Sequence, residues 1–549
     1  MGLQDQSKSF FLKKVLTGLN RSAIRKCSKW AEKYRVMGKP YPGPWTSAHH
    51  PWIDAVMDSE AEMIAVSKAA QLAFTEAALN KTFYANDIRG DSVLYILPTE
   101  GDASDFSASR FDPALELSPH LHALYTDVKN VGHKRAGAAN LFVRGSRSKS
   151  KLKSLPVAFV VCDELDEMDQ DNIASVIQRM AGQPSHQCLK LANPTIEGYG
   201  INKDFKLSNQ KEFFFKCPHC SRLTSLIFPD CLIITADEPT DPRIRDSHLI
   251  CKECKGVLKH EEKILWLTGG IWVPAFVDRL IDGYTISQLY SFTKRPDEIA
   301  AQAIRAQYDQ TEEQDLYNNT IGTVHSVAGA RVTDMDLEEC LKLSTFTMAE
   351  SRTNGHSLIT MGIDVGKWIH YEIDEWSVKV GTGPDLNSSA TPRVLKVGKV
   401  TEFEQLYTII AQLRPNFIVC DANPERRKAL EFCRSLPNCR LCIYGNAVSG
   451  KETEDTDGND LLVKVDRTAW LDLSLGRFRS KRILIPRDIP EEYKKHIKAL
   501  VRVPKKTKDS TNPNIVEYIN TDDDHFGHTR NYCEIALKLA LGAGSHENL

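Results

Sequence analysis

The sequence predicts an α/β protein built on two separate sheets. In the first half of the chain, apolar runs typical of buried strands alternate with helical segments, the pattern of a parallel sheet with helical crossovers. The second half holds a further group of apolar strands, two of which end in aspartate. Two Cys-x-x-Cys pairs lie between these groups. Together these observations predict two α/β domains, with a cysteine-rich insertion in the first.

Length and composition are those of an ordinary globular protein. At 549 residues the chain is too long for one core, so roughly two to four domains are expected. The apolar content of 42% and charged content of 26% are typical of soluble proteins, and no apolar run is long enough for a transmembrane helix. Lys13 and Lys14 interrupt the first apolar run, so no signal peptide is expected. Fourteen cysteines could suggest secretion, but most stand singly, so a reducing cytoplasm is the better interpretation.

Charge is nearly balanced but unevenly distributed. The net charge is −2, yet residues 8–39 hold ten Lys or Arg and one acid, and residues 477–508 hold twelve and three. Clustered basic residues matter more to a phosphate backbone than the total charge does. Each segment is either a solvated basic face or part of a nucleic-acid surface. The latter interpretation predicts phosphate contacts by Lys505, Lys506 and Lys508.

A strand that ends in two acids is the central feature of the first half. The apolar run 156–162 is followed directly by Asp163 and Glu164. Open α/β sheets bind ligands at the carboxyl ends of their strands. In a nucleotide hydrolase, an Asp here holds Mg²⁺ and the next Glu activates the attacking water. The alternative is a buried strand that leads into an acidic surface turn.

An earlier strand leads into a loop of small residues. Residues 62–66 predict this strand, and a loop and helix follow as far as Leu79. Free N–H groups in such a loop, together with the helix dipole, bind phosphate. The segment lacks the GxxxxGK[ST] pattern, because residues 73–75 are Ala-Phe-Thr and the only lysine is Lys68. A strand, turn and helix without a ligand remains the alternative.

Two further strands complete the predicted sheet. Residues 92–99 form one, and residues 187–192 form another that ends in Asn193-Pro194-Thr195. Strands separated by helical segments predict a doubly wound sheet with right-handed crossovers. Small and polar residues at successive strand ends could then share one phosphate site.

The two cysteine pairs carry the most specific metal signal. Cys217 and Cys220 form one Cys-x-x-Cys pair, and Cys251 and Cys254 form the other. Each spacing lets both thiolates reach one tetrahedral ion, so the four predict a closed, structural zinc site in a zinc ribbon. A redox dithiol is the alternative, and Cys231 is a spare cysteine.

A second carboxylate cluster is predicted in the last third of the chain. An apolar strand over 358–364 ends in Asp364, and another over 417–421 ends in Asp421. Asp524 precedes an amphipathic helix predicted over 532–541. This order is typical of RNase H-like folds, in which such acids bind Mg²⁺ or Mn²⁺ for phosphodiester hydrolysis. Each Asp alone is more often a strand-end cap or a turn residue.

Taken together, these motifs resemble the large terminase subunit of tailed bacteriophages, in the lambda-type GpA branch. The likeness is carried by residues 67–75 with the relocated Lys68, the strand ends at 163–164 and 193–195, the cysteine pairs and the aspartates, and spans roughly residues 28–541. That family joins an ATP-driven DNA translocase to a nuclease. The resemblance implies a RecA-like P-loop ATPase domain with a zinc-ribbon insertion, followed by an RNase H-like nuclease domain.

The resemblance also implies roles for single residues of the ATPase domain. Lys68 would reach back to the phosphates, and Thr75 would hold Mg²⁺ with Asp163. Glu164 would be the catalytic carboxylate. The segment 193–195 would sense the γ-phosphate and couple it to motion. The residues implied to bind ATP and its Mg²⁺ are Lys68, Ala73, Phe74, Thr75, Asp163, Asn193 and Thr195.

In the nuclease domain, Asp364, Asp421 and Asp524 would be the metal-binding acids. Asp523 is the nearest substitute for the third of them. The implied cofactors of the whole chain are ATP, Mg²⁺ or Mn²⁺, and Zn²⁺.

The implied organisation is a basic arm (1–45), an ATPase domain (46–350, with the zinc ribbon at about 211–275) and a nuclease domain (351–549). The implied function is packaging of viral double-stranded DNA by ATP-driven translocation, with metal-dependent cutting of the concatemer. Partners would be DNA, a small terminase subunit, the portal protein and further copies in a ring, in the host cytoplasm and without a membrane.

Two other classes stay open. A DNA repair or restriction helicase-nuclease should show helicase motifs, which we do not find in the sequence. In a non-catalytic zinc-ribbon scaffold, both carboxylate clusters would be accidental.

Overall fold

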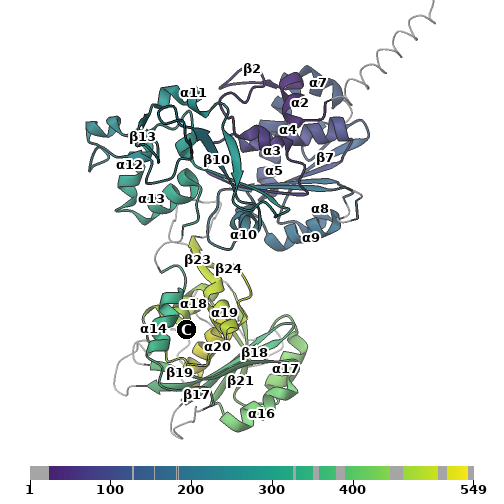
Figure 1. The fold of residues 1–549 in the computed structure, drawn as a ribbon. Helices are drawn as coiled ribbons and strands as arrows, with labels where there is room; N and C mark the ends of the chain where they lie inside the picture. Colours follow the sequence, from purple (N-terminus) through teal and green to yellow (C-terminus); the bar gives the residue numbers. More distant parts are fainter. Residues whose placement is uncertain are drawn as a thin grey trace, which may run out of the picture. The chain divides into compact units, whose positions relative to one another are not determined.

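The computed structural model describes residues 24–541 except 126–128, 154, 181, 184, 326–328, 350–357, 379–389, 446–460 and 505–515. The chain divides into two compact units, residues 1–327 and 328–549 (Figure 1). The expected boundary was residue 350. Helix α14 (Asp334–Lys342) accounts for the difference, because its Leu337 and Cys340 pack in a core of the second unit.

An eleven-stranded mixed sheet forms the centre of the first unit. Its order is β11-β10-β16-β3-β9-β8-β4-β7-β6-β5, and β15 pairs with β10. Strands β10, β16, β3, β9, β8, β4 and β7 are parallel to their neighbours in this order. The strands are β3 (Met63–Lys68), β4 (Val93–Leu97), β5 (Lys129–Asn130), β6 (His133–Ala136), β7 (Ala139–Gly145), β8 (Phe159–Asp163), β9 (Gln187–Ala192), β10 (Lys211–Lys216), β11 (Leu223–Thr224), β15 (Ile271–Pro274) and β16 (Asp282–Ile286).

Helices cover both faces of this sheet (Figure 1). Alternate residues of β8 show the period of two: Phe159 and Val161 join one core cluster, and Val160 and Cys162 join another. The helices are α2 (Cys27–Tyr34), α3 (Ile53–Asp58), α4 (Phe74–Tyr84), α5 (Glu100–Phe106), α6 (Asp112–Leu117), α7 (Pro119–Leu124), α8 (Lys149–Leu152), α9 (Gln170–Met180), α10 (Gly200–Leu207), α11 (Lys263–Leu267), α12 (Pro296–Ala306) and α13 (Gln310–Asp315).

The phosphate-loop region differs in its boundaries from the sequence expectation. Strand β3 extends to Lys68, so this lysine is its last residue rather than part of the loop. Helix α4 continues to Tyr84, five residues past Leu79, because Phe83 is fully buried and anchors its last turn. Of the expected basic arm over 1–45, residues 1–23 lie outside the described part, and the remainder contains α2.

The cysteine-rich region continues directly from the large sheet. Strand β10 turns back into β11 as a hairpin. A separate three-stranded sheet of β12 (Leu232–Ile233), β13 (His248–Ile250) and β14 (Val257–Leu258) follows, in that spatial order. Cys217 and Cys220 lie in the hairpin between β10 and β11, and Cys251 and Cys254 lie in the hairpin between β13 and β14.

A six-stranded sheet in the order β19-β18-β17-β20-β21-β22 forms the second unit. Strands β19, β18 and β17 are antiparallel, and β17, β20, β21 and β22 are parallel. The elements are β17 (Leu358–Val365), β18 (Ile369–Val378), β19 (Ala390–Val400), α16 (Glu404–Leu413), β20 (Phe417–Asp421), α17 (Arg426–Arg434), β21 (Cys439–Tyr444), β22 (Leu462–Val465), α18 (Arg467–Arg479), α19 (Glu491–Ala499), β23 (Leu500–Pro504), β24 (Val516–Asn520) and α20 (His525–Ala540).

Helix α20 lies directly across strand β17. A Cβ atom at Gly362 would stand 2.1 Å from the carbonyl oxygen of Thr529, so only glycine permits this approach. The helix begins at His525, seven residues before the predicted start at Tyr532. This earlier start places Asp524 at the N-cap of the helix.

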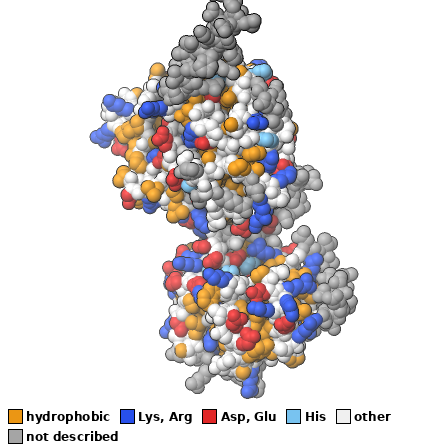
Figure 2. All heavy atoms as spheres, turned by 90° about the vertical axis from the view of Figure 1, so that its right-hand side faces the viewer, with side chains coloured by type: hydrophobic (Ala, Val, Ile, Leu, Met, Phe, Trp, Pro, Cys, Tyr) orange, Lys and Arg blue, Asp and Glu red, His pale blue; other side chains and the backbone are white. Residues whose placement is uncertain are grey.

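Basic and acidic side chains are interspersed over the face shown in Figure 2. Within the basic segment 477–508, Arg477 is buried against Glu534. Lys481 pairs with Asp336, and Lys498 pairs with Asp334. These three basic residues are therefore paired with acids of the same unit. Lys505, Lys506 and Lys508 lie outside the described residues. No described helix is long and apolar enough to cross a membrane.

Candidate active sites

Three adjacent strands of the first unit bring their carboxyl ends to one point. In the order β3-β9-β8, they supply Lys68, Asn193 just after β9, and Glu164 just after β8. The ammonium group of Lys68 donates to Asn193 Oδ1 at 3.0 Å and to Glu164 Oε1 at 3.3 Å. Lys68 is only 5% exposed, whereas the Glu164 side chain is 41% exposed. The structure thus joins three strand ends that the sequence could only propose to share a site.

Asp163 is buried beside this group and has one oxygen without a partner. Its Oδ2 accepts a hydrogen bond from the Tyr95 hydroxyl at 2.7 Å, and Oδ1 has no hydrogen-bond partner. Burial raises the pKa of Asp163 to about 6, against the lowering effect of the Lys68 charge; Thr75 also lowers it. An unsatisfied carboxylate oxygen near a threonine hydroxyl is a donor set that fits Mg²⁺.

The loop between β3 and α4 has the backbone of an anion-binding nest. Gln71 and Ala73 are both left-handed, with φ of 57° and 64°. Successive turns of this kind gather N–H groups on one side of the loop. The side chain of Phe74 is 2% exposed and packs in the core, so only its backbone is available to a phosphate.

Asn193 and Thr195 have different partners. Thr195 directs both its N–H and its hydroxyl to Asp166 Oδ2, at 2.9 and 2.7 Å. Burial raises the pKa of Asp166 to about 6 despite these hydrogen bonds. Asn193 instead donates to Asn319 Oδ1 at 2.6 Å. Asn193 therefore faces Lys68, while Thr195 anchors the turn behind it.

Asn319 is a contact of the site that the sequence analysis did not find. It lies in the π-helical segment Leu316–Ile321, donates to Asp315 Oδ1 at 2.6 Å, and accepts the Ala70 N–H through its backbone carbonyl at 2.8 Å. No motif marks it, because it meets the loop only through the fold. A cavity of about 580 Å³ adjoins this contact; its lining residues are Ala70, Gln71, Gln288, Lys294, Gln302, Arg305, Glu312, Asp315, Asn319 and Thr320.

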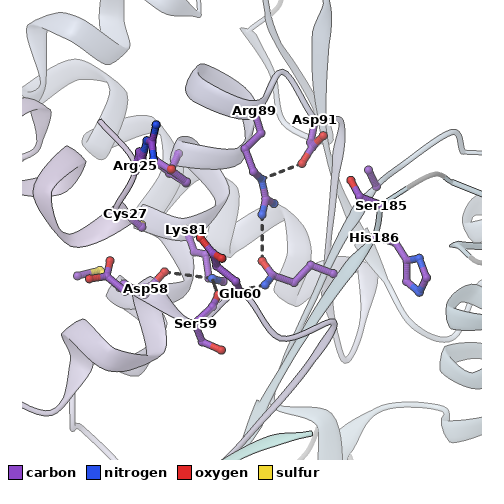
Figure 3. A pocket seen from close by; sticks show the side chains of 14 residues that line it. Arg25, Cys27, Asp58, Ser59, Glu60, Lys81, Arg89, Asp91, Ser185 and His186 are labelled. Carbon is purple, nitrogen blue, oxygen red and sulfur yellow. Dashed lines mark hydrogen bonds and ion pairs between the residues drawn. The ribbon is translucent and has the colours of Figure 1, made fainter. Parts of the chain in front are cut away.

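A second cavity, of about 230 Å³, lies at the amino ends of strands in the same sheet (Figure 3). Asp91, Ala158 and Gln187 line it at or just before the starts of β4, β8 and β9. The ammonium group of Lys81 donates to the backbone carbonyls of Met57 and Ser59, at 3.0 and 2.6 Å. This cavity is therefore separate from the carboxyl-end cluster.

The four predicted cysteines do come together. One sulfur atom each of Cys217, Cys220, Cys251 and Cys254 lies within 4.8 Å of the other three. His219 Nε2 donates to the Val257 carbonyl at 2.7 Å, and His219 is not in this group.

The two cysteine hairpins repeat the same backbone pattern. The N–H of Ser221 donates to the Cys217 carbonyl at 2.9 Å, and the N–H of Lys255 donates to the Cys251 carbonyl at 3.0 Å. Both Ser221 and Lys255 are left-handed, with φ of 59° and 60°. Equal turns present two thiols each toward the shared centre, an arrangement that fits a tetrahedral ion.

In the second unit, Asp364 and Asp421 end adjacent parallel strands. Ile363 of β17 is opposite Cys420 of β20, so the next residues lie side by side at the sheet edge. Burial and the neighbouring Asp364 charge raise the pKa of Asp421 to about 7. Two neighbouring carboxylates at one sheet edge fit a divalent cation between them.

Asp524 is the N-cap of α20 and directly precedes His525, whose ring contacts Asp364. His528 Nε2 lies 3.2 Å from its Oδ2. Burial raises the pKa of Asp524, but this hydrogen bond and the His528 and Arg467 charges outweigh burial, so the pKa is lowered. Asp523 is exposed, whereas Asp524 is partly buried.

Two histidines at this site were not assigned a role from the sequence. His525 Nδ1 lies 2.8 Å from Asp364 Oδ2, and the His370 ring stacks on the His525 ring. Among the described residues, the ligand group within 4.8 Å here is Asp364, His370 and His525; the three aspartates together do not form one. The adjacency of His525 to Asp524 was a usable signal, whereas His370 is isolated in sequence.

Comparison with known proteins identifies one part of the chain. Residues 40–272 match the family model described as phage terminase large subunit gpA, ATPase domain. No curated protein matches the chain.

Several solved structures are similar to the chain. The large terminase of bacteriophage HK97 is 12% identical, with coverage of 94% of this chain and 99% of that one and a TM-score of 0.49. The large terminase ATPase domain of Thermus phage P74-26 is 12% identical, with coverage of 50% and 94% and a TM-score of 0.32. The large terminase nuclease of thermophilic phage G20c is 10% identical, with coverage of 36% and 95% and a TM-score of 0.23.

Proposed function

We propose that this chain is a DNA-packaging motor that hydrolyses ATP and cuts DNA, because residues 40–272 match the family model of the phage terminase large subunit gpA, ATPase domain. In this proposal the first unit is a RecA-like ATPase domain with a zinc-ribbon insertion. The second is an RNase H-like, metal-dependent endonuclease. The observation that carries the proposal is the convergence of Lys68, Glu164 and Asn193 at the carboxyl ends of three parallel strands.

In the ATPase domain, each residue has a role that follows from its position. Lys68 would neutralise phosphate charge from the end of β3, and Thr75 and Asp163 would hold the Mg²⁺ that accompanies ATP. Bound Mg²⁺ would neutralise charge on the transferring phosphoryl group. Glu164 is exposed enough to reach a water and would orient and deprotonate it. Its present contact with Lys68 keeps it at the site.

Asn193 would report the state of the phosphate site to the helical segment beyond it. It touches Lys68 through Oδ1 and Asn319 through Nδ2. A change in the partner of Lys68 would alter both hydrogen bonds. Thr195, bound to Asp166, would keep the turn rigid so that the change is transmitted.

The second unit supports a nuclease through its acids. Asp364, Asp421 and Asp524 would bind Mg²⁺ or Mn²⁺, which would supply a hydroxide nucleophile and stabilise the leaving oxygen. Asp364 and Asp421 are neighbours on β17 and β20, and α20 brings Asp524 to them. An antiparallel trio of strands joined to parallel strands, with a helix across β17, supports the RNase H-like assignment.

The cysteine cluster would bind one structural Zn²⁺. The matched hairpins at Cys217 and Cys251 support a zinc ribbon. Four thiolates leave no open position for a substrate, so the ion would contribute stability rather than catalysis.

The proposed partners follow from the packaging role. They are double-stranded DNA, a small terminase subunit that selects the site, the portal protein of the procapsid, and further copies of this chain in a ring. Packaging would take place in the host cytoplasm. DNA contacts would be mainly to the backbone, because a translocase must tolerate every sequence.

The test measures ATP hydrolysis and plasmid cleavage on the same purified samples. We expect Glu164→Ala to abolish ATP hydrolysis while metal-dependent cleavage remains, and Asp364→Ala to do the reverse. Glu167→Ala is the matched control beside the first site, since Glu167 is the last residue of the 3₁₀ helix Leu165–Glu167 and makes no described hydrogen bond with Lys68. Retention of both activities in both variants would overturn the assignments.

A further inference from the structure

The second unit holds a group of possible metal ligands that differs from the three acids. One ligand atom each of Asp364, His370 and His525 lies within 4.8 Å of the other two. They come from three elements, β17, β18 and α20. Asp364 and His370 are directly opposite in the antiparallel pair β17–β18, so backbone pairing fixes their separation.

His370 has an unmet requirement for a partner. Its residue is 2% exposed, and its Nδ1 is buried without a hydrogen-bond partner. Leaving a ring nitrogen unpaired in a buried position costs free energy, and such groups are rare in folded proteins. A bound ion at this position is a physical reason for keeping an imidazole there.

The rings around the group are held in place by stacking. His370 and His525 stack with centroids 4.5 Å apart and planes 9° apart. His496 contacts both rings at 5.7 Å, but its Nδ1 accepts the Phe526 N–H at 3.4 Å. His496 therefore packs beside the group with its Nδ1 already hydrogen-bonded, whereas the Nδ1 of His370 has no hydrogen-bond partner.

We propose that Asp364, His370 and His525 bind a divalent transition-metal ion through one carboxylate oxygen and two imidazole nitrogens. Imidazole nitrogen favours first-row transition metals, whereas Mg²⁺ prefers oxygen ligands only. The nuclease centre would then hold one nitrogen-liganded position, and Asp421 and Asp524 would remain for an oxygen-liganded ion. The inference rests on the proposed nuclease function in sharing Asp364 with it.

The experiment adds Mn²⁺ to the full chain and uses pulsed electron paramagnetic resonance, which detects nitrogen nuclei of imidazoles bound to the ion. We expect nitrogen coupling in the wild type. His370→Phe, which keeps a stacking ring, and His525→Phe should each weaken the coupling and lower Mn²⁺ affinity by at least about tenfold. His496→Phe is the matched control and should retain both.

Bound Mn²⁺ without nitrogen coupling, or coupling unchanged in both His370→Phe and His525→Phe, would overturn the inference. His525 is half-buried, so His525→Phe decides the question if His370→Phe does not fold. Plasmid cleavage in Mg²⁺ separates this result from the proposed function. Cleavage that depends on Asp421, without nitrogen coupling to Mn²⁺, would leave the nuclease intact and remove the histidine site alone.

Discussion

The guanidinium group of Arg477 and the carboxylate of Glu534 form an ion pair inside the second unit, with each side chain only 1% exposed. Arg477 Nε donates to both carboxylate oxygens, at 3.0 and 2.8 Å. Arg530 contacts the same carboxylate from the other side, at 3.0 Å. This arrangement ties α18 to α20, the helix that has Asp524 at its N-cap.

Replacing Arg477 with methionine should destabilise the second unit. The substitution leaves part of the Glu534 charge buried without compensation, which costs about 3 kcal/mol or more. Urea denaturation measures the loss. Lys495→Met, an exposed change on α19, is the control and should leave the midpoint unchanged. Equal midpoints for the two variants would show that Arg477 contributes no net stability.

Asp163→Asn should stabilise the magnesium-free protein above pH 6. The folded pKa of about 6 lies above the ordinary value of 3.8, so the folded state binds the proton more tightly. The free energy of unfolding therefore falls as pH rises from 3.8 to about 6. Above pH 6 the buried charge of Asp163 lowers it by its full amount, at most about 3 kcal/mol. Asparagine keeps an oxygen for the Tyr95 hydroxyl and removes the charge.

Thermal unfolding of wild type and Asp163→Asn at pH 8 and pH 4, without added Mg²⁺, measures this difference. The gain should be present at pH 8 and nearly absent at pH 4. ATP hydrolysis by the variant should be lost, because the proposed Mg²⁺ ligand is gone. A gain of equal size at both pH values would contradict the electrostatic explanation.

Cys217→Ser should release the metal of the cysteine cluster, while Cys231→Ser should not. Both cysteines are buried in the same region, but the Cys231 sulfur faces the Ser225 carbonyl at 3.7 Å and is outside the cluster. Elemental analysis should find equimolar zinc in wild type and Cys231→Ser, and a strong deficit in Cys217→Ser. Full zinc content in Cys217→Ser would exclude a four-cysteine site.

Gly362→Ala should disturb the nuclease site without a change in any polar residue. The added methyl would overlap the Thr529 carbonyl of α20, so the helix must shift or the unit loses about 1–3 kcal/mol. Gly476→Ala is the control, since its nearest atom would be 3.9 Å away. Only Gly362→Ala should cleave DNA more slowly and unfold at a lower urea concentration. Unimpaired cleavage would mean that α20 need not hold its present distance from β17.

The sequence predicted strand ends well because the evidence for them is local. The apolar run before Asp163 and the one before Asp421 each form a buried strand of the sheet, ending at that aspartate. Helix boundaries were less accurate, as the early start of α20 at His525 shows. Its first residues include His525 and Gly527, which are weak helix formers, and packing against β17 and Leu500 overrides that preference.

Partners that are distant in sequence could not be predicted. Asn319 reaches Asn193 across 126 positions, and His370 meets His525 across the sheet. Neither contact can be recognised from a sequence motif, because each depends on how separate elements pack together and not on residue spacing within one element. The buried pairing of Arg477 with Glu534 was hidden from the sequence for the same reason, since the two residues lie on different helices.

The position of Asp524 on α20 also has a consequence during protein synthesis. Asp364 and Asp421 leave the ribosome long before this helix does, and the helix must then fold onto β17 next to Gly362. Nascent chains that stop before residue 524 would carry the whole first unit but lack the third acid. With Asp524 in its proposed role, incomplete translation products would therefore be unable to cut the host chromosome or unpackaged genomes.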